Sequence, residues 1–337
     1  MGTVIPLKKE INNSYLELKN LAGSKLEDVS DLINIKLASE INLIQKMTDH
    51  HLNSGGKRIR PLLTLAASKL CGYKGGSRDV NLAACVELIH SATLLHDDVI
   101  DGSDLRRGNK TANSIWGNQS SILVGDYLFS RCFELMVSDS SPEILKLLSS
   151  TSSKIAQGEV LQLEHKGEID VLEETYFNII NMKTAALFAA AARVGACITN
   201  KSKKEKDALE SYGKNIGLAF QIADDALDYY ATQKIFGKEI GKDFFEGKAT
   251  LPLIIIFQKS NNEERVFLKE VFKKEKRNED DFSEVLALIN KYKAVQESFK
   301  KAEYFVNTAQ GALEVFEDSL EKKVLQKLTQ FSINRSF

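Results

Sequence analysis

Proline is nearly absent from this chain. Of its 337 residues, only Pro6, Pro61, Pro142 and Pro252 are proline. Proline interrupts helices, and the long stretches between these four are rich in Leu, Ala, Lys and Glu, which favour helices. Apolar residues recur at three- and four-residue intervals along 26–52 and 80–101, and no segment shows strand alternation. We therefore expect one all-α domain over residues 1–337, in which the first ~25 residues are flexible or associated with a dimer partner.

Charge and cysteine content exclude several classes of protein. The formal net charge is −1, so nothing favours nucleic acid through bulk electrostatics. No apolar run approaches the ~20 residues that cross a bilayer, and the N-terminus lacks the layout of a signal peptide. The cysteines are scattered and predicted to be buried free thiols in a reducing compartment: Cys71, Cys85, Cys132 and Cys197. We expect a cytoplasmic protein without a nucleic-acid partner.

Two segments, 80–101 and 208–231, are apolar almost all round and are predicted to lie in the middle of the bundle. Each ends in an Asp-Asp-x-x-Asp cluster: Asp97, Asp98 and Asp101 in the first, Asp224, Asp225 and Asp228 in the second. Helical residues four apart share a face, so the outer two aspartates of each cluster point the same way. The middle one is rotated by about 100°.

Carboxylates in a bundle interior require a compensating cation. Oxygen-only ligands suit Mg²⁺, which keeps waters and shares its coordination with phosphate. A solvated helix end is the alternative for one cluster, but two clusters that each close an apolar helix favour a divided metal site. Calcium is disfavoured because the spacing of an EF-hand is missing.

Basic residues supply a partner for phosphate. Lys57, Arg58 and Arg60 follow two glycines in "NSGGKRIRP" (53–61), which lacks the Gly and Ser/Thr positions of an NTPase loop. Further cations are Arg106, Arg107, Lys183, Lys238 and Lys248. Each alone is typical of solvated surface. Beside two acidic clusters they predict a diphosphate clamp, because guanidinium groups match phosphate oxygens. Lys183 stands in an apolar helix before Thr184 and is predicted to point into a pocket rather than to snorkel outward.

From about residue 40 onward the chain resembles the trans-polyprenyl diphosphate synthases of the long-chain bacterial type, which include octaprenyl diphosphate synthases. Six motifs in order carry the resemblance: "GGKRIRP", "LLHDDVIDGSDLRRG", "GEVLQL", "KTAALF", "FQIADDALDY" and "GK…EGKATLP". It implies an isoprenoid-synthase-type helical bundle around a deep central cavity, and a homodimer.

The resemblance also implies roles for individual residues. Isopentenyl diphosphate would bind Lys57, Arg60, His90 and Arg107. The allylic diphosphate would bind through Mg²⁺, three ions when a diphosphate is present, held by Asp97, Asp101 and Asp224. Further contacts to this diphosphate would come from Arg106, Lys183, Lys238 and Lys248. Asp98, Asp225 and Asp228 would complete the two clusters, and Thr184 and Gln221 would line the reacting centre.

The sequence departs from the family in one loop. The family commonly has Gly-Asp-Asp where this chain has Gly241-Lys242-Asp243. We expect the loop to order because Asp243 is kept, with altered local charge. The mechanism implied is loss of diphosphate from the allylic substrate, attack by the isopentenyl double bond and loss of a proton. The departing diphosphate is the expected proton acceptor, and His96 is a distant alternative.

Product length depends on what lines the tunnel. Ala92 precedes Asp97 by five residues and lies roughly 7–8 Å deeper along the helix. The resemblance implies an aromatic ring there in relatives with short products, so Ala92 leaves the tunnel open. We expect its floor among Phe129, Phe133, Met136 and Leu148, although ordinary core packing is the alternative for each.

The leading hypothesis is a Mg²⁺-dependent prenyltransferase that extends farnesyl diphosphate to a long polyprenyl diphosphate, octaprenyl in the first instance, for a quinone side chain. Alternatives are a geranylgeranyl diphosphate synthase, a class I terpene cyclase and a non-catalytic subunit of a heteromeric synthase. A cyclase has no reason to keep "GGKRIRP", and a non-catalytic subunit should have lost motif residues. Because the product is so apolar, transient association of the protein with a membrane during product release stays an open alternative.

Overall fold

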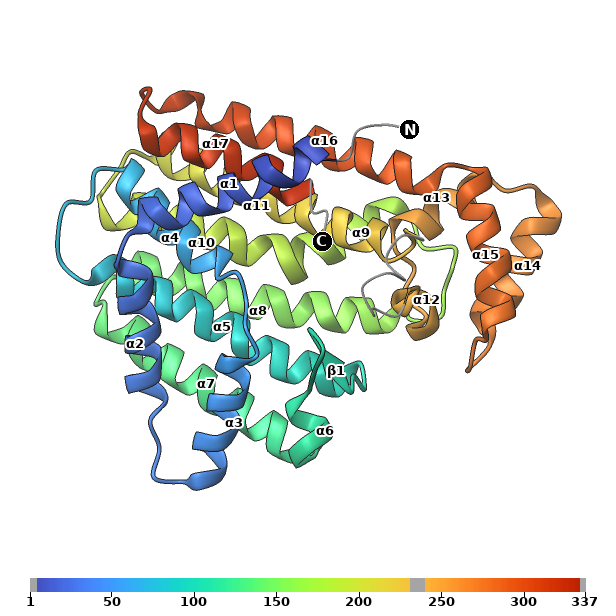
Figure 1. Cartoon of the computed structure of the whole chain (residues 1–337), viewed down its shortest axis with the longest axis horizontal. Coiled ribbons are helices and arrows are strands. Elements are labelled where there is room, and N and C mark those ends of the chain that lie inside the picture. Colours follow the sequence, from blue (N-terminus) through green and yellow to red (C-terminus); the bar gives the residue numbers. More distant parts are fainter. Residues whose placement is uncertain (1–4, 231–239, 334–337) are drawn as a thin grey trace.

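The computed structural model describes residues 5–230 and 240–333, and most of this part of the chain is helical (Figure 1). The helices of the first half are α1 (Ile5–Ala22), α2 (Lys25–Leu37), α3 (Asn42–Asn53), α4 (Ile59–Leu70), α5 (Arg78–Ile100), α6 (Ala112–Trp116), α7 (Asn118–Ser138) and α8 (Pro142–Glu164). Those of the second half are α9 (Glu173–Ile180), α10 (Ala186–Ile198), α11 (Lys203–Leu227), α12 (Lys242–Glu246), α13 (Leu251–Lys259), α14 (Asn262–Lys273), α15 (Glu279–Lys291), α16 (Ala294–Ala312) and α17 (Leu320–Ile333). A π-helix, η1 (Asn181–Ala185), joins α9 to α10, and a 3₁₀ turn, η3 (Leu313–Val315), follows α16.

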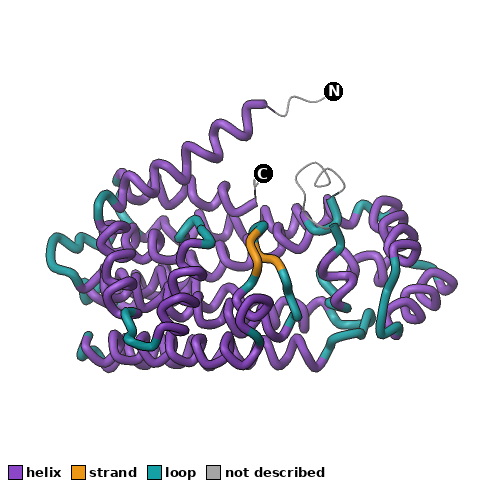
Figure 2. Tube along the Cα trace, turned by 60° about the horizontal axis from the view of Figure 1, so that its bottom comes forward, coloured by secondary structure: helices purple, strands orange, loops and turns teal. Residues whose placement is uncertain are grey.

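The expected all-α fold is confirmed, with one small addition. Two-residue strands β1 (Leu105–Arg106) and β2 (Asn109–Lys110) pair in antiparallel register just after α5 (Figure 2). The two residues between them, Arg107 and Gly108, have φ of 53° and 80°. Positive φ at both central residues is what a tight two-residue hairpin turn requires. Because strands this short carry no apolar alternation, the sequence pattern could not predict them.

Small residues let α10 lie very close to both of its neighbours, α4 and α11. A Cβ on Gly195 would stand 2.5 Å from the backbone carbon of Ala67 on α4, and one on Gly213 of α11 would stand 2.3 Å from the carbonyl oxygen of Phe188. Almost every residue of α10 is buried. This close approach explains the alanine run in "ALFAAAARVGACI", since larger side chains would push the three helices apart.

The two segments predicted to be central are central. Helix α5 is buried along most of its length and packs against α4, α7 and α10. Helix α11 runs through two hydrophobic clusters: its first half, with Tyr212, joins the larger one, and its second half, with Ile222, joins the cluster around Phe244. Helix α11 therefore joins the two clusters, and the single domain over 1–337 stays a prediction.

The first and last helices pack against each other, and the cysteines are buried. Helix α1 packs against α17 and α4, with the ring of Tyr15 stacked 6.0 Å from that of Phe331. All four cysteines are buried free thiols, as predicted. Within the two described ranges, no helix combines the length and the apolar composition that crossing a membrane requires.

The contact between α10 and α11 gives a testable prediction. Gly213→Ala should lower the free energy of unfolding by about 1–3 kcal/mol, because its methyl group would overlap the carbonyl of Phe188. Gly311→Ala on α16 is the matched control, since nothing lies within 4 Å of the added carbon; helix propensity should make that change neutral or stabilising by up to about 0.5 kcal/mol. Urea unfolding followed by circular dichroism measures both. Equal midpoints for the two variants would contradict the close helix contact.

Candidate active site

The first acidic cluster stands at the C-terminal end of α5, and its three carboxylates have different partners. Asp98 is 2% exposed and accepts hydrogen bonds from Arg106, at 2.8 Å from Nε. Asp101, the residue that caps α5, accepts a hydrogen bond from Lys248 Nζ at 2.9 Å. Asp98 therefore points into the protein, whereas Asp101, at the end of the helix, contacts a lysine from the later part of the chain.

The charge of Asp97 is poorly compensated. Burial raises the pKa of its carboxyl to about 7; Lys183 opposes this shift, and the carboxylates of Glu159 and Asp101 add to it. By contrast, although burial opposes it, Lys248 lowers the pKa of Asp101. The C-terminal end of a helix also carries partial negative charge. A further cation beside Asp97 would therefore be strongly favoured.

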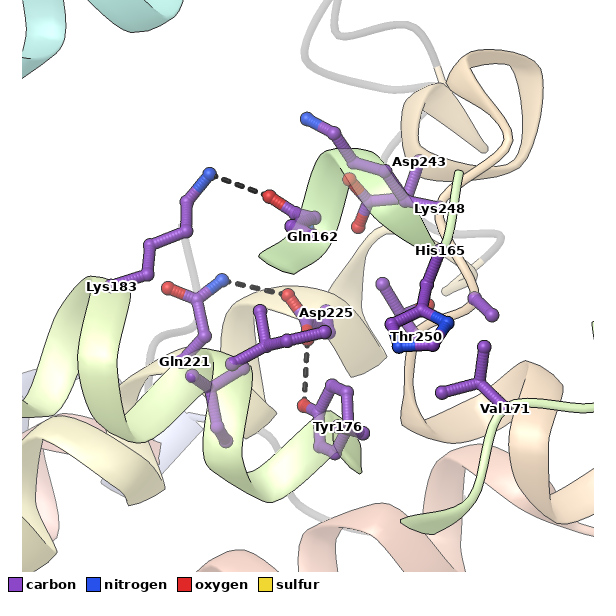
Figure 3. Close-up of a pocket in the computed structure, with 13 residues that line it drawn as sticks. Gln162, His165, Val171, Tyr176, Lys183, Gln221, Asp225, Asp243, Lys248 and Thr250 are labelled. Atoms are coloured by element: carbon purple, nitrogen blue, oxygen red, sulfur yellow. Dashed lines mark hydrogen bonds between the residues drawn. The ribbon is translucent and has the colours of Figure 1, made fainter. Parts of the chain in front are cut away.

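The second acidic cluster, at the C-terminal end of α11, is held by a chain of hydrogen bonds (Figure 3). Asp225 is 5% exposed and accepts from Tyr176 Oη at 2.7 Å and from Gln221 Nε2 at 2.8 Å. Thr184 Oγ1 in turn donates to Gln221 Oε1 at 2.8 Å. Burial still raises the pKa of Asp225 to about 6. Asp224 precedes it by one residue on α11 and is only partly buried.

Helix α12 and the residues beside it connect the two clusters. The backbone N–H of Asp243 donates to Asp228 Oδ2 at 2.9 Å, on the side of the second cluster. On the side of the first, Lys248 reaches Asp101, and Lys242 donates to Ser103 Oγ at 2.8 Å. The expected ordering of the loop stays a prediction, and Lys242, the lysine that departs from the family pattern, contacts the turn after α5.

Lys183 projects from the π-helix η1 into the polar pocket, as the sequence predicted. Its ammonium lies 2.8 Å from Gln162 Oε1 and 2.7 Å from Glu159 Oε1, both on α8 (Figure 3). A Cβ on Gly158 would stand 2.7 Å from the backbone nitrogen of Lys183, so only glycine lets α8 come this close. A π-turn inside a helix often marks a functional site.

The cations predicted to bind isopentenyl diphosphate lie around the start of α4 and the hairpin. Arg60 Nη1 lies 3.0 Å from His90 Nε2, and Arg107 donates to the carbonyl of Gly55. Because a guanidinium only donates, the facing nitrogen of His90 must accept. Burial lowers the pKa of His90 well below its usual value, and Arg60 lowers it further. The Nζ of Lys57 lies 4.7 Å from the ring of Phe331 on α17.

The residues predicted to line the tunnel do not share one environment. Ala92, Leu148 and Met136 are buried to 1% exposure or less. Phe129 is partly buried, and its ring lies 6.5 Å from that of Phe133. Phe133 itself is 46% exposed on α7, so it does not close a tunnel within a single chain. Lys238, a predicted diphosphate ligand, lies outside the described residues.

The structure adds residues that sequence reasoning missed. His51 sits beside the arginines, and Glu87 accepts from Arg58 Nη1 at 2.7 Å. Glu159 and Tyr176 hold Lys183 and Asp225. Glu159 stood in a quoted motif, "GEVLQL", but its partner is 24 positions away. For Glu87, the only signal in the sequence was its acidic side chain within an otherwise apolar segment.

The donor set fits a magnesium ion shared with phosphate. Asp97 and Asp101 offer carboxylate oxygens, and because burial raises the pKa of Asp97, a cation beside it would favour the charged form. Among the residues that the structure describes, no three His, Cys, Asp or Glu side chains converge to hold an ion by themselves. Mg²⁺ commonly uses only one or two carboxylates and completes its shell with water and substrate phosphates.

Comparison with known proteins gives concordant matches. The sequence profile of the family described as polyprenyl synthetase matches residues 41–289. The chain is 35% identical to the octaprenyl diphosphate synthase of Haemophilus influenzae over 98% of this chain and 100% of the relative. It is 37% identical to that of Escherichia coli, over 95% and 98%. A polyprenyl synthase of Caulobacter crescentus, crystallised with calcium and isoprenyl diphosphate, superposes with a TM-score of 0.91 at 41% identity, covering 95% of this chain and 98% of that one.

His51 should make the protein sensitive to acid. Burial lowers the pKa of its imidazole to about 4, and Arg106 and Arg58 lower it further. A depressed histidine pKa means that the folded state resists protonation, so stability is complete above the ordinary pKa and is lost as the pH falls toward 4. Between pH 8 and pH 5 this group should cost about 2 kcal/mol. Urea midpoints across that range measure it.

His51→Gln cannot take up the proton and should lose less stability between pH 8 and pH 5 than the wild type. His165→Gln, at a half-buried site at the end of α8 away from the arginines, is the control and should lose as much stability between pH 8 and pH 5 as the wild type. Parallel curves for the wild type and His51→Gln would show that His51 is not held neutral among the arginines.

Proposed function

This chain belongs to the polyprenyl synthetase family and is a trans-prenyltransferase, and on that premise we propose that it condenses isopentenyl diphosphate repeatedly onto farnesyl diphosphate. The product is an all-trans octaprenyl diphosphate that becomes the side chain of a quinone. One observation carries the proposal. The two acidic clusters contact the same short segment, Asp228 through the backbone of Asp243 and Asp101 through Lys248, and the arginine group that includes Arg58 lies nearby.

The allylic diphosphate binds between the clusters. Lys183 and Lys248 are the cations best placed for it, because both are already within 3 Å of carboxylates that face the pocket. Bound at Asp97, Asp101 and Asp224, Mg²⁺ would take up the negative charge that develops on the departing diphosphate. Gln221 lines the same pocket and accepts a hydrogen bond from Thr184 behind it, and Arg106 neutralises the inward-facing Asp98.

Isopentenyl diphosphate binds at the arginine group. Arg60 and Arg107 present guanidinium forks that match phosphate oxygens, and Lys57 adds an exposed ammonium from the same loop. His90 remains neutral at physiological pH and orients Arg60. Binding of an anion here would relieve the mutual repulsion of the cations, a gain that a neutral substrate would not provide.

We infer that two copies of this chain form a homodimer. Large apolar side chains are exposed along α7 and α8: Leu123 67%, Val137 64%, Phe133 46%, Val160 58% and Leu163 55%. Several large apolar side chains exposed on two helices favour an interaction site there, and a homodimer across α7 and α8 would cover them. Phe133 would then be buried as the tunnel proposal requires.

An assay of turnover tests the function. Purified protein, isopentenyl diphosphate, farnesyl diphosphate and Mg²⁺ should yield polyprenyl diphosphates, sized by mass spectrometry. Asp97→Asn should reduce the rate roughly a hundredfold or more, because an interaction with the charge of the transition state is lost. Asp31→Asn, an exposed carboxylate on α2, is the control and should leave the rate unchanged. Absence of any product from the wild type, or equal rates for Asp97→Asn and Asp31→Asn, would refute the proposal.

Ala92→Phe tests the product length. Ala92 is fully buried beneath the first cluster, so a phenyl ring there should block the growing chain after one or two additions while the first condensation continues. Ala92→Ser adds one oxygen and should keep the long product. If Ala92→Phe also made octaprenyl diphosphate, the tunnel would have to run elsewhere. A wild-type product of geranylgeranyl length would replace the octaprenyl assignment.

A further inference from the structure

Tyr176 begins a chain of hydrogen bonds that runs through Asp225 to Gln221 (Figure 3) and from there to Thr184. It belongs to α9, is 3% exposed and directs its hydroxyl at Asp225 Oδ2. The other oxygen of Asp225 accepts from the amide nitrogen of Gln221. Both carboxylate oxygens are therefore engaged, one by each neighbour.

The order of donors in this chain has one consistent direction. Tyr176 and the amide nitrogen of Gln221 both donate to Asp225, which as a carboxylate can only accept. The amide oxygen of Gln221 is then the atom left to receive the hydroxyl hydrogen of Thr184. Reversing the amide would set its oxygen against a carboxylate oxygen. The rotamer of Asp225 therefore decides which way Gln221 and Thr184 present their polar atoms.

Tyr176 is the group that holds that rotamer. Without its hydroxyl, Asp225 keeps a single side-chain partner and can turn about its last torsion, a type of torsion with broad minima. Tyr176 also lies on α9, the helix that leads into η1, from which Lys183 enters the pocket. Its position on α9 thus ties the end of α11 to the segment that presents one of the proposed substrate contacts.

We propose that Tyr176 is a positioning residue for the prenyl transfer: through Asp225 it orients the side chain of Gln221, which lines the pocket that receives the allylic diphosphate. This inference rests on the proposed function and adds to it a residue that touches neither substrate. Small displacements of reacting groups cost large factors in rate. Loss of the Tyr176 hydroxyl should therefore lower kcat by more than its effect on stability alone would explain.

Tyr176→Phe removes only the hydroxyl, and Tyr212→Phe is its matched control. Tyr212 is fully buried and donates to the carbonyl of Leu325 at 2.6 Å, in a contact between α11 and α17. Both variants lose one buried hydrogen bond, so both should lower Tm by a similar few degrees. Only Tyr176→Phe should lower kcat, by about tenfold, with KM for isopentenyl diphosphate within about twofold of the wild type.

A double variant tests the route through Gln221. If Tyr176 acts through the hydrogen-bond chain, Tyr176→Phe should have little further effect once Gln221→Ala has broken it, within about twofold in kcat. Multiplying effects would overturn the proposed route. An active wild type with equal kcat for Tyr176→Phe and Tyr212→Phe would overturn the positioning role alone. An inactive wild type would refute the proposed function, and this inference with it.

Discussion

Negative charge that is gathered inside a helical bundle has to be balanced there, and in this protein it is gathered at the C-terminal ends of α5 and α11. The helix dipole is unfavourable to carboxylates at both places, and burial adds to the cost, as the raised pKa values of Asp97 and Asp225 show. The surrounding elements supply the compensation. Lys183 comes from a π-turn, Lys248 from the residues after α12, and Arg106 from the hairpin.

The hairpin has a second role that follows from its tight turn. Arg106 points to the buried Asp98, whereas Arg107, the next residue, contacts Gly55 in the loop before α4. Adjacent residues thus serve the acidic and the basic halves of the site. A non-glycine residue with positive φ is costly to hold, and Arg107 and Arg58 both have this conformation. Strain of this kind at two arginines fits a site whose geometry matters more than local stability.

Much of the arrangement could be predicted from the sequence. The scarcity of proline and the apolar periodicity indicated helices, and the placement of α5 and α11 in the interior followed from their lack of a polar face. The partners of the site residues could not be predicted. Glu159, Tyr176 and His51 act on groups that are brought near only by packing, and no local pattern signals such pairs. Phe133 was expected at a tunnel floor but is half exposed on α7.

The sequence by itself determined which chemical groups are present and which helix face each occupies. Spacing of three and four residues is a local property, so it places Asp97 and Asp101 on one face wherever the helix lies, with Asp98 rotated by about 100° from Asp97. The tertiary structure decided which charges meet. Lys248 pairs with Asp101 across 147 positions, and Gly158 and Gly213 permit approaches that any side chain would prevent. Such contacts depend on the distances between helices, which only the packing of the whole core establishes.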